Sequence, residues 1–328
     1  MTKKKRVLSG MQPSGLLHLG NLMGALDNWR KLQDEYECYY FIADWHALTT
    51  QYADTSKMRT YVHEMVIDWL AAGLDPEKAV LFQQSQLPEH AVLHVLFSMI
   101  TPLPWLERVP TYKEKMEQIE DRDLYTYGFL GYPVLQAADI LIYKADFVPV
   151  GIDQLPHLEL TREIGRRFNA FYGDVLPEPQ PLMTEYPKLP GTDGRKMSKS
   201  YNNCLYLSDT TEDITKKVMA MVTDPARQRR TDPGNPDICP LYTLDQIFAP
   251  KEWCDHVKRE CPKAGIGCVD DKKELLKHLL EYLRPLQERR RSLIADPKKV
   301  AEIIAAGSAK ARVIAKETLA LVQDAMKL

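Results

Sequence analysis

The first half of the chain alternates short apolar runs with segments in which apolar residues recur every three or four positions. Leu22, Leu26 and Trp29 show the second pattern, which is typical of one face of a helix. The apolar runs, each predicting a buried strand, lie at 6–9, 39–43, 79–83 and 147–150. Because strands and helices alternate, we predict an α/β fold built on a parallel sheet.

The pattern changes twice further along the chain. Between about residues 88 and 138 it is helical and interrupted by prolines, which predicts an insertion into the sheet domain. Beyond residue 203 the strand signal disappears, and Asp296-Pro297 supplies a cap and a first-turn proline for one of several helices. We therefore predict a doubly wound sheet domain over 1–203 and an all-helical domain over 204–328.

Composition adds little to this picture. The 328 residues are 45% hydrophobic and 27% charged, as in an ordinary globular protein. No apolar run approaches the ~20 residues of a membrane span. Basic residues 3–6 lead into a predicted strand and not into a signal peptide, so we expect a cytoplasmic protein with no membrane partner. The net charge of −2 does not indicate a nucleic-acid partner.

Two short segments carry candidate chemistry. The first, from Gln12 to Asn21, reads Gln-Pro-Ser-Gly-Leu-Leu-His-Leu-Gly-Asn and joins a predicted strand to a predicted helix. Backbone N–H groups and the helix dipole favour an anion there. The second reads Gly-Arg-Lys-Met-Ser-Lys-Ser over 194–200 and places Lys196 and Lys199 three apart in a loop. Two such cations can balance negative charge on a departing pyrophosphate, so the pair predicts an ATP site.

A third segment, from Tyr132 to Asp139, predicts one wall of an amino-acid pocket. Pro133 can begin a helix on which Gln136 and Asp139 lie three apart, with Tyr132 near the same face. The neighbouring residues are apolar, and a carboxylate among them is costly unless it is paired. An indole N–H can only donate, so Asp139 is a candidate acceptor for an indole ring. A local hydrogen-bond network around a lone Asp is the simpler alternative.

Together with Val148-Pro-Val-Gly151-Ile-Asp153-Gln154, these segments resemble the tryptophanyl-tRNA synthetases, a family of class I aminoacyl-tRNA synthetases. The resemblance covers essentially the whole chain. It implies a Rossmann-like catalytic domain, a helical anticodon-binding domain and a homodimer joined through the insertion. The implied reaction uses ATP and Mg²⁺ to convert L-tryptophan to tryptophanyl-adenylate and pyrophosphate, and then transfers tryptophan to the 3′ end of tRNA(Trp).

The resemblance also implies the roles of individual residues. The catalytic residues would be Lys196, Lys199 and His18. The ATP site would comprise Gln12, Ser14, Gly20, Asn21, His46, Gly151, Asp153, Lys196, Met197, Ser198 and Lys199. The tryptophan site would comprise Asp139, Tyr132, Gln136, Gln154, Ile140, Val148 and Val150, with Tyr132 and Gln154 on the α-ammonium group.

Some positions depart from the family or match it loosely. Leu8, Gln136 and Ile152 differ from the residues that many members carry, and such changes would alter how the ring and the ammonium group are held. Lys113 and Lys115 resemble further phosphate contacts, with an exposed helix face as an equal alternative.

Four of the six cysteines cluster in the predicted helical domain, and they are Cys239, Cys254, Cys261 and Cys268. Some members of the family carry a four-cysteine iron–sulfur site in this region. Their pattern has a further Cys three residues after Cys268, where this chain has Asp271. Thiolates suit such clusters far better than carboxylates do. We therefore favour a degenerate site with free thiols over a [4Fe-4S] cluster that recruits Cys254.

Three other functions share parts of the pattern. A tyrosyl-tRNA synthetase has the same fold and lysine loop, but the Tyr132-to-Asp139 helix and Asp153-Gln154 favour tryptophan. A small-molecule nucleotidyltransferase would not need the helical tail. A non-catalytic protein that binds tRNA or an amino acid would not need His18, Asp139 and both loop lysines together.

Overall fold

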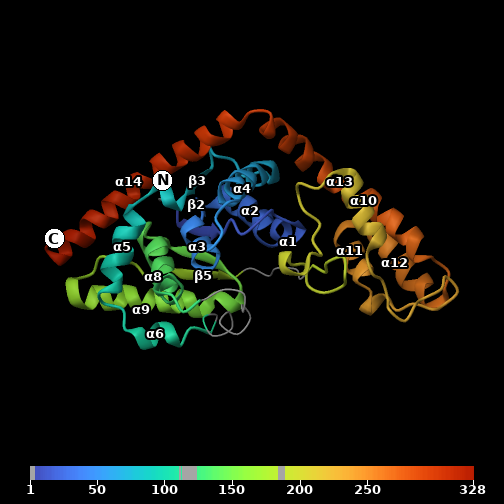
Figure 1. The fold of residues 1–328 in the computed structure, drawn as a ribbon, viewed down its shortest axis with the longest axis horizontal. Helices are drawn as coiled ribbons and strands as arrows, with labels where there is room; N and C mark the ends of the chain where they lie inside the picture. The colour runs from blue at the N-terminus through green and yellow to red at the C-terminus, as the bar shows by residue number, and fades with distance from the viewer. Residues whose placement is uncertain (1–3, 111, 113–123, 184–188) are drawn as a thin grey trace.

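A five-stranded parallel sheet forms the centre of the computed structural model, which describes residues 4–110, 112, 124–183 and 189–328 (Figure 1). The strands are β1 (Arg6–Met11), β2 (Glu37–Ile42), β3 (Ala79–Gln83), β4 (Phe147–Val150) and β5 (Gln180–Met183). Their order in the sheet is β3-β2-β1-β4-β5, with parallel pairing throughout. This order is that of a Rossmann-like doubly wound sheet, so the predicted fold class is confirmed.

Helices bury both faces of this sheet. In β2, Tyr40 and its alternate neighbours belong to one core cluster, whereas Tyr39 and Phe41 belong to the other. Strands buried on both faces read as continuous apolar runs, which is why the sequence pattern revealed them. The helices of this half are α1 (Leu19–Asn21), the π-helical η1 (Leu22–Leu26), α2 (Asp27–Glu35), α3 (Asp44–Gln51), α4 (Met58–Ala72), η2 (Gln84–Gln86), α5 (Glu89–Ser98), α6 (Leu103–Glu107), α8 (Tyr127–Ile142), η3 (Ile152–Gln154) and α9 (Leu155–Tyr172).

Two local predictions differ from the structure. The edge strand β5 was not predicted, because its Gln-Pro-Leu-Met sequence is short and is only partly buried. Pro133 was expected to begin a helix but lies inside α8, which Thr126 caps by accepting a hydrogen bond from the Phe129 N–H at 3.1 Å. A proline inside a helix removes one backbone hydrogen bond, and the packing of α8 between α5 and α9 offsets this loss.

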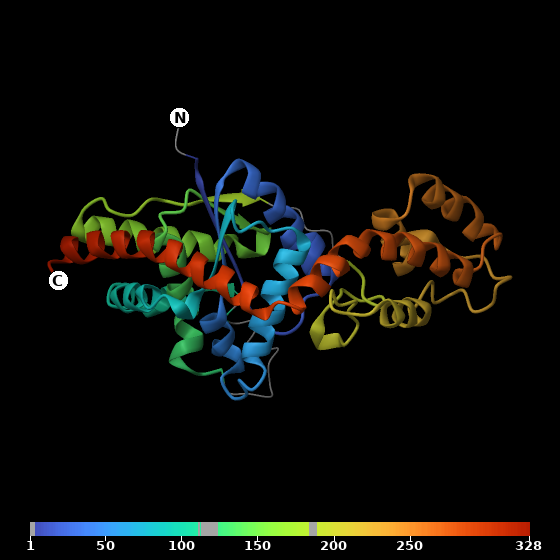
Figure 2. The ribbon, with the colours of Figure 1, turned by 90° about the horizontal axis from the view of Figure 1, so that it is seen from above.

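A helical region follows the sheet and extends to one side of it (Figures 1 and 2). Its α13 packs against α10 and α11 and also against α4 of the sheet half. Near this contact the Arg290 guanidinium lies between Glu64 and Asp68 of α4. The elements of this region are η4 (Lys199–Tyr201), α10 (Thr211–Ala220), η5 (Pro236–Ile238), α11 (Pro240–Phe248), α12 (Lys251–Glu260), η6 (Cys261–Lys263), α13 (Cys268–Ile294) and α14 (Pro297–Met326).

The helix α14 leaves this region and runs back across the sheet half (Figure 2). Gly307 lies directly against the backbone of Leu81, and Ser308 Oγ accepts a hydrogen bond from the Gln83 N–H at 3.4 Å. The helix thus covers the edge strand β3, so residues 204–328 do not form one spatially separate unit. The anticodon-binding role given to that range stays a prediction. No helix in the described ranges is long and apolar enough to cross a membrane.

Candidate active site

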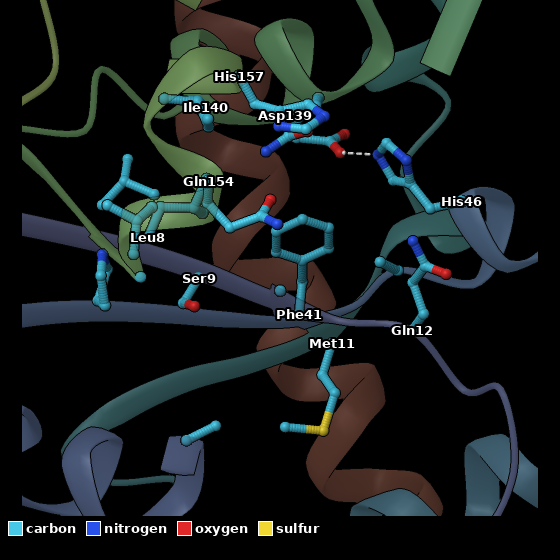
Figure 3. Close-up of a pocket in the computed structure, with 18 of the residues that line it drawn as sticks. Leu8, Ser9, Met11, Gln12, Phe41, His46, Asp139, Ile140, Gln154 and His157 are labelled. Carbon is cyan, nitrogen blue, oxygen red and sulfur yellow. Dashed lines mark hydrogen bonds and ion pairs between the residues drawn. The ribbon is translucent and has the colours of Figure 1, made fainter. Parts of the chain in front are cut away.

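A cavity of about 530 Å³ opens at the carboxyl ends of β1 and β4 (Figure 3). These two strands pair only at Val7 and Phe147, so they diverge toward those ends. The chain leaves β1 toward β2 and leaves β4 toward β5, in opposite directions along the sheet. Such a switch point is where doubly wound sheets bind their ligands.

The cavity brings together residues from six separate segments of the chain. Most of the predicted ATP and tryptophan residues line it, and they are Gln12, His46, Tyr132, Gln136, Asp139, Ile140, Val148, Val150, Gly151, Asp153, Gln154 and Lys196. Leu8 also lines it, whereas the side chain of Ile152 is 77% exposed and does not. Of the three departures from the family, only Leu8 and Gln136 therefore bear on the pocket.

One aromatic wall of the cavity was missed by sequence reasoning. Phe41 of β2 points into the cavity from beneath (Figure 3). A Cβ added to Gly10 would lie 2.5 Å from the Phe41 ring, so the glycine makes room for it. This pairing could not be predicted from the local sequence, because Gly10 and Phe41 become neighbours only when β1 pairs with β2.

Asp139 is 1% exposed and accepts hydrogen bonds from three side chains. Gln84 Nε2 lies 2.8 and 2.9 Å from its two oxygens, His46 Nε2 lies 2.7 Å from Oδ2, and His90 Nδ1 lies 2.7 Å from Oδ1. Burial raises the pKa of Asp139, but the hydrogen bonds from His46 and His90 outweigh it and hold the pKa below its ordinary value. The cavity wall therefore carries a fixed anionic acceptor.

Tyr132 is held by a second residue that sequence reasoning missed. Its hydroxyl lies 2.7 Å from Nε2 of His157, which comes from α9 and also lines the cavity. The pair fixes the position of the Tyr132 hydroxyl, and Gln136 and Gln154 line the same cavity. His157 lies in the same resembling segment as Gln154, but its pairing with Tyr132, 25 residues away, leaves no signal in the local sequence.

The first motif segment lies beside the cavity, and most of its predicted residues do not line it. His18 caps α1, since its Nδ1 accepts from the Gly20 N–H at 3.1 Å, and Asn21 Oδ1 accepts from the His18 N–H at 3.1 Å. Burial, and then the nearby Lys199 charge, lower the pKa of His18 to about 4. The ring is therefore neutral, and because Nδ1 accepts, its proton lies on Nε2.

The lysine loop packs onto this turn. Lys199 Nζ donates to the Gly15 carbonyl at 3.1 Å and lies 3.5 Å from Ser14 Oγ, while Lys196 faces the cavity. Burial lowers the pKa of Lys199 to about 8. Neither Ser14, Met197, Ser198 nor Lys199 lines the cavity itself.

Asn203 fixes the shape of this loop. Its amide donates to Asp193 Oδ1 at 2.6 Å and to the Lys196 carbonyl at 3.2 Å, and its oxygen accepts from the Ser198 N–H at 2.8 Å. The loop residues around both lysines are thus ordered from one buried side chain. Lys113 and Lys115 lie outside the described residues.

The cysteines surround a small cavity of about 10 Å³, lined by Cys239, Cys261, Cys268 and Asp271 but not by Cys254. Arg227 Nη1 lies 3.5 Å from Cys261 Sγ, and Asp271 Oδ1 accepts from Trp253 Nε1 at 3.0 Å. This space holds at most one water. The cavity offers three thiols with carboxylates beside them, whereas an iron–sulfur cluster takes four thiolates, so the residues present do not fit such a cluster.

Comparison with known proteins places this geometry in a family. A family described as tRNA synthetases class I (W and Y) matches residues 1–284. The tryptophan–tRNA ligase of Thermotoga maritima is 54% identical over 325 residues, 98% of this chain and 99% of that protein. The corresponding ligase of Aquifex aeolicus is 46% identical and covers 98% of this chain and 100% of its own length.

A solved structure agrees with the sequence relatives. The tryptophanyl-tRNA synthetase of Campylobacter jejuni, crystallised with ADP and tryptophan, superposes with a TM-score of 0.90 at 32% identity, covering 98% of this chain and 100% of that one. The chain therefore belongs to the class I tRNA synthetase family that is specific for tryptophan and tyrosine.

Proposed function

We propose that the chain is a tryptophan–tRNA ligase, which activates L-tryptophan with ATP and transfers it to tRNA(Trp). Its relatives over nearly the full length are ligases of this name. The observation that carries the choice of amino acid is Asp139, a buried and ionised carboxylate on the cavity wall. A donor-only indole N–H is the group such an acceptor selects.

The amino acid would bind between β1 and β4. Asp139 would accept from the indole N–H, while Tyr132 and Gln154 would hold the α-ammonium group with Gln136 beside them. The apolar side chains of Ile140, Val148, Val150 and Phe41 would enclose the ring, as their positions in the cavity support. This arrangement would direct the carboxylate of the substrate toward Gln12 and Lys196 at the cavity mouth.

ATP would bind across the turn at the start of α1. Gln12, Ser14, Gly20, Asn21, His46, Gly151 and Asp153 would contact the nucleotide, together with Met197 and Ser198 of the loop. Neutral His18 would offer its Nε2 proton to a phosphate oxygen, because its Nδ1 is occupied by the Gly20 N–H. We expect Mg²⁺ to enter bound to the triphosphate, as at nucleotide sites generally.

In the first step a carboxylate oxygen of tryptophan attacks the α-phosphorus of ATP, and the bond to pyrophosphate breaks. The carboxylate is already a nucleophile, so no general base is needed. Lys196 and Lys199 would balance the charge that moves onto the pyrophosphate. In the second step a ribose hydroxyl of the tRNA terminus attacks the adenylate carbonyl and releases AMP.

The remaining partners follow from this function. The helical region α10–α13 would read the anticodon of tRNA(Trp), and the enzyme would act in the cytoplasm, where its substrates are. A homodimer would form through α5 and α6, where Val92, Val95, Met99 and Leu103 are exposed together on the insertion. Such an apolar face on adjacent helices is typical of a surface that another chain covers.

Pyrophosphate exchange tests the function directly. The purified chain should exchange pyrophosphate into ATP with tryptophan and only weakly with tyrosine, and an Asp139→Ala variant should lose that preference. Exchange that is faster with tyrosine would indicate a tyrosyl-tRNA synthetase. Absence of exchange with both amino acids would indicate a non-catalytic binding protein.

Light scattering tests the proposed dimer. The wild-type chain should have twice the mass of one chain, and Met99→Glu should shift it toward the monomer because a charge on the apolar face must be desolvated on pairing. Lys57→Glu, an exposed change away from this face, is the control. A wild-type chain of single mass would contradict the dimer.

A further inference from the structure

Gln84 is a fully buried polar residue that lies behind Asp139 and outside the cavity lining. Its Oε1 accepts a hydrogen bond from the Trp45 backbone N–H at 3.1 Å. Because the oxygen is engaged there, the amide nitrogen must face the other way. It bridges the two oxygens of Asp139 at 2.8 and 2.9 Å. The orientation of the amide is thus set by the backbone.

His90 reaches the same carboxylate from α5. Its Nδ1 lies 2.7 Å from Asp139 Oδ1, and its Nε2 lies 2.7 Å from the Tyr143 hydroxyl. An ionised carboxylate can only accept, so Nδ1 of His90 must carry a proton and donate it to Asp139. On the other side of the ring, Nε2 is held by the Tyr143 hydroxyl.

The short turn that carries Gln84 is itself immobilised. Asp44 accepts from the Ser85 N–H at 3.0 Å and from Gln83 Nε2 at 2.7 Å. From α14, the Arg312 guanidinium donates to the Gln86 carbonyl. Gln84 therefore cannot swing away from Asp139 without disturbing both neighbouring elements.

We propose that Gln84 and His90 are positioning residues that hold the Asp139 carboxylate in place as a hydrogen-bond acceptor, and that the preference for an indole N–H depends on them. This inference rests on the proposed function. Without them only His46 of the three donors would hold the carboxylate, and its oxygens could turn away from the ring N–H. The site would then cease to distinguish tryptophan from a ring without that N–H.

The test compares tryptophan with its benzothiophene analogue, in which sulfur replaces the ring nitrogen. Pyrophosphate exchange at neutral pH gives kcat/KM for both amino acids. In Gln84→Met the preference for tryptophan should fall about ten-fold or more, the effect of losing one buried hydrogen bond to a charge. The KM for ATP should not change, because Gln84 contacts no part of the proposed ATP site.

The choice of analogue separates this role from a loss of packing, because the analogue fills the same space without the ring N–H. A loss of packing would lower kcat/KM for both amino acids alike, whereas loss of the positioned acceptor lowers it for tryptophan alone. The matched control is Gln86→Met in the same turn, because Gln86 is exposed and its amide reaches only Gln83 at 3.3 Å.

A second pair of variants covers the case in which Gln84→Met does not fold. Asn at position 90 can place an amide N–H where the ring Nδ1–H lies, so His90→Asn should retain the preference that His90→Leu loses. Equal preference in both, or a Gln84→Met enzyme that discriminates like the wild type, would overturn the proposal. If the wild type activates no tryptophan, the proposed function fails instead.

Discussion

The two lysines of the 194–200 loop differ in their surroundings. Lys196 faces the cavity, whereas Lys199 is packed against Gly15, a glycine with a φ of 137°. A Cβ added at Gly15 would lie 3.1 Å from Lys199 Cδ, so the left-handed backbone and the close contact both require glycine. Burial lowers the pKa of Lys199 to about 8, which brings its charge change near the working range.

The pH dependence of ATP use should report this lysine. The charge of Lys199 is present below its pKa of about 8 and is lost as the pH rises through that value. We expect kcat/KM for ATP to fall above pH 8, because this ratio reports the free enzyme. Lys199→Arg should flatten the profile, since a guanidinium stays charged. Lys199→Ala should slow adenylate formation in single-turnover experiments much more than it weakens tryptophan binding.

A pair of buried carboxyl groups should make stability depend on pH. Asp245 of α11 faces Asp271 of α13, and burial together with the Asp271 charge raises the pKa of Asp245. The folded chain then binds a proton that the unfolded chain releases above about pH 4, so stability is lost as the pH rises from there. Asp245→Asn removes this loss.

We expect Asp245→Asn to raise the free energy of unfolding by about 1–3 kcal/mol at pH 8 and by nothing at pH 4. Denaturant titrations at the two pH values measure the difference. Asp237→Asn, at an exposed neighbouring carboxylate, serves as the control. The same effect of Asp245→Asn at both pH values would contradict the raised pKa.

Among the elements, α14 packs very closely against its neighbour, the strand β3. A Cβ on Gly307 would lie 1.8 Å from the Leu81 carbonyl oxygen of β3. Alanine is favoured over glycine within helices by about 1 kcal/mol, so an exposed position would gain stability from the change. At this contact Gly307→Ala must instead push the helix off the strand.

We expect Gly307→Ala to lower the free energy of unfolding by about 1–3 kcal/mol, the usual cost of overpacking. Urea denaturation of Gly307→Ala and of Ala305→Ser, on the exposed side of the same helix, makes the comparison. A more stable Gly307→Ala chain would show that the helix does not pack there.

The elements also show how far the sequence predicts the fold. Four strands were found because burial on both faces makes them continuous apolar runs. β5 was not predicted, because this edge strand contains a proline and shows neither a continuous apolar run nor a clear alternation of apolar and polar residues. The start of α8 was placed wrongly because Pro133 was given more weight than Thr126, although a threonine cap is an equally local signal.

The residues of the candidate site likewise divide into those that the sequence predicted and those that it did not. Residues within motifs, such as Asp139 and Lys196, were predicted and line the cavity. Gln84, His90 and His157 were not, because each acts through a partner in another element, 55, 49 and 25 residues away. Single residues of this kind leave no periodic signal in the sequence, and only the packed fold brings them together.

At the scale of the whole molecule, one ion-pair cluster joins the helical region to the sheet half. Arg290 of α13 lies 3.3 Å from Asp68 of α4 and also contacts Glu64. Burial raises the pKa of Asp68 to about 7 in spite of Arg290. Arg290 therefore offsets a charge that the interior would otherwise not tolerate.

Arg290→Met should destabilise the chain by about 3–5 kcal/mol at pH 8, because it leaves a buried carboxylate without its partner. The loss should be smaller at pH 5, where Asp68 can take up a proton, and Asp68→Asn should relieve it in the double variant. Thermal unfolding at both pH values provides the measurement. Arg291→Met, at the exposed next residue, should have little effect; a loss equal to that of Arg290→Met would contradict the pairing.

Because α14 covers β3, the edge of β3 stays exposed until α14 has been synthesised. Ser308 satisfies the Gln83 N–H from 225 positions further along the chain. At roughly 5–20 residues per second, a ribosome adds those residues over roughly 10–45 s. During that interval β3 has emerged while its outer edge is bare, and a bare edge is a template for a foreign strand. A pause in translation of the helical region would therefore lengthen the period in which the nascent chain is most open to aggregation.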